Sequence, residues 1–331
     1  MEQPSPAIGV AFSPRQAAYL GLPWDEIYRA ALGLTPRMVR LGAYWDEIEP
    51  AEGKYDWSTL DVQIEQAEAR GVPVVLTIGM KAPRYPEYFL PPWLRQRLDL
   101  AHGATVSDVE ELRTRTLAFV ERVVGRYRDH PALAYWQVEN EPLIPAGPHR
   151  WTIGLSFLTR EVALVRELDG RPIIVTMFAE VDPTMLLPWR QRELRTQAMK
   201  ILDVADILGL DIYPNLGVRA LRRDWYFHWP AWLWTPSIVG LRRLAQRMGR
   251  RAWITEAQAE PWEPGVLVHT APAPSRSVTP AGAAATVAHL RELGFDVLLL
   301  WGVEHWHMRR VRHRDPTWWA HMLAFFPRGR R

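Results

Sequence analysis

The sequence has no cysteine among its 331 residues. This absence excludes disulfide bonds, zinc sites built on thiolates and catalysis by a cysteine nucleophile. No uninterrupted run of about 18 apolar residues occurs, so the sequence predicts no membrane-spanning helix. The first residues, Met1 to Pro4, have neither the basic region nor the apolar core of a signal peptide. We therefore expect a cytoplasmic protein, and a leader already removed from this sequence is the alternative.

Lysine and asparagine are scarce. Lysine occurs at Lys54, Lys81 and Lys200 and asparagine at Asn140 and Asn215, while nearly all basic residues are arginine. The net charge is only +3, and acidic residues are interspersed with the arginines. A nucleic-acid-binding protein would instead concentrate its basic residues on one face, so we expect no nucleic-acid partner.

Short apolar runs alternate with longer amphipathic runs along the whole chain. This alternation is typical of repeated βα units around a parallel sheet, and we count eight units. The strands are expected at 8–12, 38–41, 74–78, 134–138, 173–177, 207–212, 252–255 and 297–301. A helix is expected after residue 109, where apolar residues recur at helical spacing and Ser107 with Glu110 forms a capping-box pattern.

The connections between these units are asymmetric. Glycines lie just before several strands, where helices must end, and these helix-to-strand links are short. The strand-to-helix segments at 79–107, 213–236, 257–279 and 302–315 are long and rich in aromatic and polar residues. This pattern predicts an α/β protein with a single (β/α)₈ TIM barrel over residues 1–331 and its site in the long loops at the carboxyl ends of the strands. A doubly wound sheet is the alternative, but no glycine-rich dinucleotide or phosphate loop follows any strand.

Two glutamates stand where predicted strands end. Glu141 follows the strand at 134–138, and Glu256 comes at the tip of the strand at 252–255. An acidic side chain there destabilises the fold unless it is solvated, paired or used in chemistry. Glycosidic bond cleavage needs a pair of carboxyl groups: one protonates the leaving oxygen while the other attacks the sugar or activates water. Retention requires these groups to lie about 5 to 5.5 Å apart, and inversion roughly 6.5 to 9.5 Å.

The motif Asn140, Glu141, Pro142 resembles the signature of the clan A glycoside hydrolases, and the run from Trp136 to Glu141 resembles the family 42 β-galactosidases. This resemblance implies a retaining (β/α)₈ enzyme. The match to family 5 cellulases is incomplete, because their histidine after strand three is replaced by the run Gly79 to Lys81. Their His-x-Tyr on strand six is replaced by the run Asp211 to Tyr213.

The resemblance also implies roles for individual residues. Glu141 would be the general acid and then the general base, and Glu256 the nucleophile. Four further residues would hold the nucleophile or the sugar: Asn140 as donor to the sugar 2-hydroxyl, Arg40 as the cation that keeps Glu256 ionised, Tyr213 as a hydrogen-bond donor to Glu256, and Trp301 as the aromatic floor under the reactive sugar.

Other interpretations of these residues stay open at this stage. Glu139 is an alternative acid, although strand alternation points it away from Asn140. Arg40 could pair with a core carboxylate, and Tyr213 and Trp301 could pack at the barrel rim. The run from Glu304 to His307, together with His313, is interpreted as a polar active-site loop in which His305 binds substrate, and a metal site is the alternative.

Residues 225–234 hold four of the chain's 17 tryptophans. We interpret this segment as a loop of sugar-stacking subsites or a lid. A buried plug under a long loop is the second interpretation. Contact with lipid, aided by the arginine-rich segments 242–251 and 309–331, is the third.

The sequence therefore predicts a retaining β-glycoside hydrolase that acts on a carbohydrate substrate by double displacement, with Glu256 and Glu141 and without a cofactor or metal. Two other classes remain as alternatives. One is a carbohydrate-binding barrel without catalysis, and the other is a metal-dependent TIM-barrel hydrolase that uses the histidines near residue 305.

Overall fold

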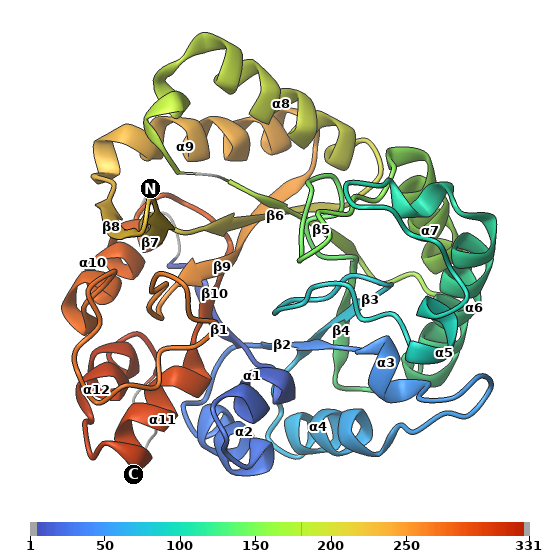
Figure 1. Ribbon diagram of the computed structural model, residues 1–331, viewed down its shortest axis with the longest axis horizontal. Coiled ribbons are helices and arrows are strands. Elements are labelled where there is room, and N and C mark those ends of the chain that lie inside the picture. The colour runs from blue at the N-terminus through green and yellow to red at the C-terminus, as the bar shows by residue number, and fades with distance from the viewer. Residues whose placement is uncertain (1–4, 180, 328–331) are drawn as a thin grey trace. The chain divides into compact units, whose positions relative to one another are not determined.

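The computed structural model describes residues 5–179 and 181–327. Eight strands form a closed barrel in the order β1-β10-β9-β6-β5-β4-β3-β2, and helices connect them (Figure 1). The fold is therefore a (β/α)₈ TIM barrel, as the alternation of apolar runs predicted. The barrel strands are β1 (Ala7–Ala11), β2 (Val39–Gly42), β3 (Val74–Ile78), β4 (Leu133–Val138), β5 (Ile173–Phe178), β6 (Ile207–Ile212), β9 (Arg251–Gln258) and β10 (Val297–Trp301).

The eight predicted strands are all confirmed, and most of their ends agree within a residue. The exception is β9, which continues to Gln258. Glu256 therefore lies within the strand and not at its tip. Residues 252–258 of β9 are all buried, which explains how a strand with two polar residues beyond Thr255 still belongs to the barrel.

The chain divides into two compact units. The first, here the Glu256 unit, comprises Met1–Val39, Ala179–Thr196 and Leu210–Arg331; the second, the Glu141 unit, comprises Arg40–Phe178 and Gln197–Gly209. That the whole chain acts as a single domain stays a prediction.

In the Glu141 unit, β4 pairs in parallel with β3 on one side and with β5 on the other. Helix α6 packs against α7, and its predicted apolar face, which includes Leu112, Phe119 and Val123, is buried. The helices of this unit are α3 (Trp45–Ile48), α4 (Ser58–Glu68), α5 (Pro92–Arg95), the 3₁₀ helix η1 (Val106–Asp108), α6 (Glu110–Tyr127) and α7 (Leu155–Leu168). Helix α8 (Pro188–Leu202) contributes residues to both units.

The expected capping box at Ser107 and Glu110 is wrong. The N-cap of α6 is Val109, which makes no side-chain capping bond, and Ser107 belongs to η1. The Ser107 hydroxyl instead accepts a hydrogen bond from the Gly154 N–H at 2.8 Å. This hydrogen bond holds the segment that leads into α7, so the Ser107 hydroxyl does not cap α6.

In the Glu256 unit, β10 lies between β1 and β9 in parallel register. Thr279 is the N-cap of α10, and its hydroxyl accepts the Gly282 N–H at 3.1 Å. The helices of this unit are α1 (Pro14–Tyr19), α2 (Trp24–Leu32), the 3₁₀ helix η2 (Pro183–Leu186), α9 (Ala231–Arg247), α10 (Pro280–Arg291), α11 (Val303–Arg312) and α12 (Thr317–Leu323).

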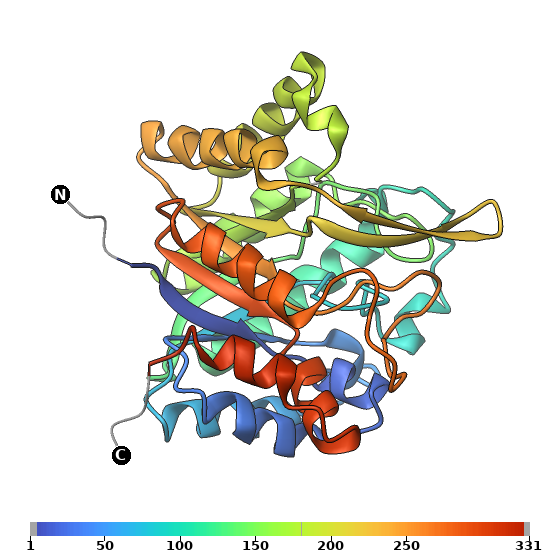
Figure 2. The same cartoon turned by 90° about the vertical axis from the view of Figure 1, so that its left-hand side faces the viewer.

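Two of the predicted long loops contain regular structure. The segment 302–315 is mostly α11, and the segment 213–236 contains the antiparallel hairpin of β7 (Asn215–Ala220) and β8 (Arg223–His228), followed by the start of α9 (Figure 2). The hairpin turn places Leu221 and Arg222 at φ of 52° and 59°. Asparagine and glycine usually occupy such a turn, so this hairpin could not be predicted from its turn residues. Among the described residues, the structure holds no helix with the length and apolar character to cross a membrane.

Candidate active site

Glu141 lies three residues beyond Val138, the last residue of β4, and Glu139 and Asn140 lie between them. Glu139 and Glu141 have positive φ angles of 57° and 44°. Such backbone is unfavourable for residues other than glycine and persists only where surrounding contacts hold it, often at functional sites. The Glu141 side chain is 12% exposed, so it is accessible but mostly shielded from water.

Asn140 and Glu141 share one support from β5. The Thr176 hydroxyl accepts the Glu141 N–H at 2.9 Å and lies 3.3 Å from Asn140 Oδ1, to which it donates. Gln137 Nε2 donates to the same Oδ1 at 3.2 Å. Because both contacts use the oxygen of the amide, the NH₂ group of Asn140 is oriented away from them as a donor.

Lys81, which follows β3, also supports Glu141. Its side chain is fully buried, and its Nζ donates to the backbone oxygen of Glu141 at 2.8 Å. The same Nζ lies 3.0 Å from Glu87 Oε2 and 4.0 Å from Glu141 Oε2. The buried ammonium therefore fixes the backbone of Glu141 and places positive charge near its carboxyl group.

A buried carboxyl pair lies beneath this segment. Glu139, which follows β4, and Glu161, which lies on α7, are both fully buried. Glu139 accepts the N–H groups of Met80 at 2.8 Å and Lys81 at 2.6 Å, and so it holds the segment that carries Lys81. Among the described residues, no N–H group donates to either oxygen of Glu161. Full burial without a hydrogen-bond donor disfavours an ionised Glu161, so we assign Glu161 as the protonated partner of Glu139.

The pKa values of the pair reflect this environment. Burial raises the pKa of Glu139 to about 7, against the opposing effect of its hydrogen bonds from Glu161, Met80 and Lys81. Burial and the neighbouring Glu139 carboxylate raise the pKa of Glu161 well above its ordinary value. Glu139 is thus a structural carboxyl group that faces backbone amides, whereas Glu141 is the accessible one.

In the Glu256 unit, Glu256 is 4% exposed and accepts a hydrogen bond from the Tyr213 hydroxyl at its Oε2. Tyr213 follows β6 and is itself buried. Next to Glu256, the Thr255 hydroxyl donates to Asp211 Oδ1 at 2.6 Å. The tyrosine donor that the resemblance implied is therefore in contact with the carboxylate that was expected to be the nucleophile.

Aromatic rings surround Tyr213. Trp262, in the segment after β9, contacts the Tyr213 ring edge-on at 5.3 Å between centroids, and Trp301 does so at 6.4 Å. Trp301 is buried at 8% exposure, whereas Trp262 is 46% exposed. Trp262 thus offers an accessible apolar face in the same cluster as Tyr213, and sequence reasoning missed it.

The end of β9 is tied to the hairpin. Gln258 Oε1 accepts the Asn215 N–H at 3.0 Å, and Gln258 Nε2 donates to the Asn215 carbonyl at 2.6 Å. The Gly217 N–H donates to the Trp262 carbonyl at 2.7 Å. A side chain at Gly217 would lie 2.6 Å from that oxygen, so glycine permits this close approach.

Arg40 is buried on β2 at 1% exposure and donates from Nη1 to Gln137 Oε1 at 3.4 Å. Gln137 in turn donates to Asn140 Oδ1. The arginine is thereby linked to the segment that carries Glu141. Its expected support of Glu256 stays a prediction.

The polar loop expected around His305 is wrong, because these residues form the first turns of α11 and are buried. The histidines have separate partners: His305 packs edge-on against Trp318 at 5.1 Å, His307 contacts Glu26 at 3.2 Å, and His313 contacts the Thr270 carbonyl at 2.9 Å. Within residues 5–179 and 181–327, no group of three His, Cys, Asp or Glu side chains is arranged to hold a metal. A substrate contact of His305 stays a prediction.

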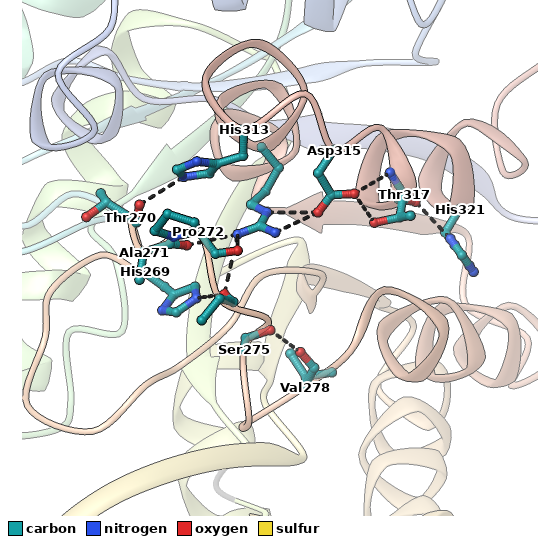
Figure 3. A network of polar contacts seen from close by, with 12 residues as sticks. His269, Thr270, Ala271, Pro272, Ser275, Val278, His313, Asp315, Thr317 and His321 are labelled. Atoms are coloured by element: carbon teal, nitrogen blue, oxygen red, sulfur yellow. Dashed lines mark hydrogen bonds and ion pairs between the residues drawn. The ribbon is translucent and has the colours of Figure 1, made fainter.

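Helix α11 instead anchors the long segment that follows β9 (Figure 3). The guanidinium of Arg309 donates twice to Asp315, at 2.7 and 3.0 Å. Its Nη1 donates to the carbonyls of Ala271 at 2.9 Å and Pro272 at 3.1 Å. Although burial opposes it, hydrogen bonds from Thr317 and Arg309 lower the pKa of Asp315 to about 2.

Arg309→Met should lower the free energy of unfolding by about 2 to 3 kcal/mol at pH 7. Asp315 has a depressed pKa in the folded state, so its stabilisation is present above the unfolded value near 4 and is lost as the pH falls toward 2. The difference in the free energy of unfolding between the wild type and Arg309→Met should therefore become smaller below about pH 4. Urea unfolding between pH 3 and pH 7 measures it, with Arg310→Met as the matched control. A gap independent of pH would contradict this assignment.

The tryptophan-rich segment 225–234 is not a loop but the strand β8 and the first turn of α9. Its tryptophans have different environments. Trp234 is buried, packs edge-on against His289 at 5.3 Å and donates from Nε1 to the Trp229 carbonyl at 3.2 Å. Trp225 and Trp232 are 47% and 67% exposed. The plug interpretation therefore suits Trp234, and the exposed rings remain candidates for contact with a ligand.

Trp234→Ala should lower the free energy of unfolding by about 3 to 5 kcal/mol, because it leaves a cavity under α9. Trp232→Ala should change it by less than about 0.5 kcal/mol, since its ring is mostly in water. Chemical denaturation of the two variants measures the difference. Similar losses in both would show that the segment does not pack as described.

Comparison with known proteins gives one family match and several fold matches. Residues 22–146 match the family model of glycoside hydrolase family 42, described as β-galactosidase. A β-galactosidase of Arthrobacter sp is 34% identical over 111 residues, which are 29% of this chain and 15% of that protein. The β-galactosidase BgaA of Clostridium cellulovorans is 28% identical over 126 residues, which are 36% of this chain and 19% of that protein.

Among solved structures, the β-galactosidase of Halorubrum lacusprofundi aligns with 88% of this chain and 52% of its own, at 17% identity and a TM-score of 0.60. Xylanase 10B of Thermotoga petrophila aligns with 91% of this chain and 86% of its own, at 15% identity and a TM-score of 0.56. The chain thus spans about half the length of the first of these and only a small part of the curated relatives. Together the matches confirm the resemblance to clan A glycoside hydrolases.

Proposed function

We propose that this chain is a retaining β-glycoside hydrolase, with Glu256 as the nucleophile, Glu141 as the acid and base, and β-galactosides as its preferred substrates. The observation that carries the proposal is the hydrogen bond from the Tyr213 hydroxyl to Glu256 Oε2. A buried carboxylate oriented by a phenol beside an exposed tryptophan is a nucleophile next to a surface on which a sugar ring can stack.

In the first step, Glu256 attacks the anomeric carbon while the bond to the leaving oxygen breaks and Glu141 donates its proton to that oxygen. In the second step, Glu141 removes a proton from water, which attacks the anomeric carbon and releases Glu256. Thr176 and Lys81 hold the backbone of Glu141 on both sides, at its N–H and its carbonyl oxygen. Both contacts of the Asn140 amide with Gln137 and Thr176 use its oxygen, which supports a role of its NH₂ group as donor to the sugar 2-hydroxyl.

The preference for galactosides rests on the family match over residues 22–146 and on the β-galactosidase relatives. Xylanase 10B shares the fold, so other β-glycosides belong in the test. Trp262 and Trp301 would contact the apolar face of the sugar in this proposal.

A panel of 4-nitrophenyl β-glycosides tests the function, with galactoside, glucoside, mannoside and xyloside as the main members. We expect the highest kcat/KM for the galactoside, and the β-anomer should be the first product in a proton NMR time course. Exhaustive chelation should leave the rate unchanged. Absence of turnover on the whole panel would favour a binding protein, and a first product with the α-anomer would exclude the double displacement.

A further inference from the structure

A pocket of about 440 Å³ lies within the Glu141 unit, and its lining residues are not among those assigned to catalysis so far. Its walls come from α3, from the segment 86–96 after β3 and from the segment 146–151 after β4. Tyr88, Leu90 and Trp151 give it apolar faces. A volume of this size accommodates a small organic ring with its substituents.

The pocket is connected to Glu141 by a short chain of contacts. Tyr88, which lines the pocket, forms an antiparallel bridge with Lys81, and its ring centroid lies 5.9 Å from Lys81 Nζ. That Nζ donates to the Glu141 backbone oxygen at 2.8 Å. The wall of the pocket is therefore built on the same lysine that supports Glu141.

The polar residues that line the pocket are Asp46, Arg95, Gln96 and His149. Arg95 Nη2 donates to His149 Nε2 at 2.7 Å, and the His149 ring stacks on Trp151 with 4.6 Å between centroids. The Arg95 guanidinium also lies over Trp151, at 5.8 Å from its centroid. Histidine and tryptophan thus hold the guanidinium in place without neutralising it.

Arg95 differs in this respect from its neighbour Arg97. Arg97 Nη2 pairs with Glu52 at 2.8 Å. Within the described ranges 5–179 and 181–327, Arg95 has no ion-pair partner, and its exposed side chain lines the pocket together with Asp46 of α3. A guanidinium with unused donors beside apolar walls is suited to a carboxylate carried on a ring.

We propose that this pocket is the subsite for the leaving group and that it selects leaving groups in which a ring carries a carboxylate, bound by Arg95. The inference rests on the proposed function, because a general acid must face the oxygen of the departing group. Groups built around Glu141 therefore lie on the leaving-group side of the bond. An aromatic acid and a hexuronic acid share this chemistry.

The first test uses a pair of matched substrates, the 4-carboxyphenyl and 4-carbamoylphenyl β-galactosides. The wild type should have a KM about tenfold lower for the carboxyl substrate, since one charge-assisted hydrogen-bonded pair gives roughly that discrimination. Arg95→Gln should bring this ratio of KM values to about 1. Arg97→Gln is the matched control and should keep the wild-type ratio. An unchanged ratio in Arg95→Gln would overturn the proposal.

The second test measures binding without turnover. Titration calorimetry with 4-hydroxybenzoate and with glucuronate, each against its neutral counterpart 4-hydroxybenzamide or glucose, decides between the two sources of the carboxylate. At least one acid should bind about tenfold more tightly than its counterpart, and Arg95→Gln should remove that difference. Equal binding of both acids and both neutral compounds to the wild type would refute the subsite.

The two tests also separate this inference from the proposed function. Selective binding of an acid by a protein that cleaves no glycoside would retain the subsite and refute the catalytic proposal. Cleavage of both galactosides with equal KM would retain the catalytic proposal and refute the subsite. Melting temperatures of Arg95→Gln and Arg97→Gln within about 2 °C of the wild type show that neither substitution acts by unfolding the chain.

Discussion

Glu256→Ala should abolish turnover of every glycoside, with kcat/KM lowered at least about 10⁴-fold whatever the leaving group. Without the carboxylate no glycosyl enzyme can form, and no other group in contact with Tyr213 replaces it as a nucleophile in the proposed mechanism. The effect should be the same for 4-nitrophenyl and alkyl galactosides. Steady-state rates on both substrates measure it.

Glu141→Ala should discriminate between the same substrates. A good leaving group such as 4-nitrophenolate needs little protonation, so the first step should be nearly unaffected and the slow second step should lead to a burst of nitrophenol. An alkyl galactoside depends on the acid, and its kcat/KM should fall about 10² to 10⁴-fold.

Azide distinguishes the two roles by stereochemistry. In Glu256→Ala, azide should replace the nucleophile and yield the α-galactosyl azide, whereas in Glu141→Ala it should attack the glycosyl enzyme and yield the β-galactosyl azide. The opposite assignment of these products would show that the roles of the two glutamates are reversed. Glu139→Ala is unsuitable as a control here, because its carboxyl group holds the segment that carries Lys81.

Glu161→Gln should make the protein more stable at alkaline pH and flatten the pH dependence of its stability. In the wild type, burial raises the pKa of Glu139 to about 7 and the pKa of Glu161 well above its ordinary value. Because the pKa values are raised in the folded state, the contribution of these two carboxyl groups to stability is fully present below the unfolded pKa near 4.3. This contribution is lost as the pH rises toward 7 and beyond. Glutamine is neutral, and its NH₂ group can still donate to Glu139, so the loss that belongs to Glu161 should disappear.

At pH 8 the free energy of unfolding of Glu161→Gln should therefore exceed that of the wild type, and at pH 5 the difference should be smaller. Urea denaturation at pH 5 and pH 8 measures it. Glu139→Gln is the contrasting variant: its single amide oxygen cannot replace two carboxylate oxygens that accept from Met80 and Lys81. It should lose about 1 to 3 kcal/mol at both pH values. A gain in Glu139→Gln, or none in Glu161→Gln, would show that Glu161 is not the protonated partner.

The barrel could be predicted from the sequence because its strands are buried and apolar and are separated by helices. Each βα unit therefore has a recognisable pattern within its own stretch of sequence. The hairpin of β7 and β8 could not be predicted. Its turn uses Leu221 and Arg222 where glycine or asparagine is usual, and its side chains do not alternate between an apolar and a polar face. The histidines near residue 305 were misassigned because their polar character suggested a loop, whereas α11 buries both His305, which packs against Trp318, and His307, which contacts Glu26.

At the site, the sequence identified residues that carry chemical groups typical of the reaction, namely Glu141, Glu256 and Tyr213. It missed residues that act by position. Thr176 and Glu161 look like ordinary members of a buried strand and of an amphipathic helix, and only the three-dimensional contacts reveal their partners. For Lys81 a signal existed, because it is one of three lysines in a chain rich in arginine and follows a barrel strand directly. An arginine there would be larger and could not present a compact ammonium to a backbone oxygen.

Gly79 and Glu139 lie so close together that the residue at one position limits which residues fit at the other. Gly79 has a φ of 116°, and a Cβ at this position would lie 2.2 Å from Glu139 Oε1. The carboxyl group cannot move aside, since two backbone N–H groups and full burial hold it. Any relative with a larger residue at position 79 must therefore carry a shorter side chain at position 139, and it must then satisfy the amides of residues 80 and 81 in another way. We therefore expect positions 79 and 139 to covary among relatives that retain this buried carboxyl group.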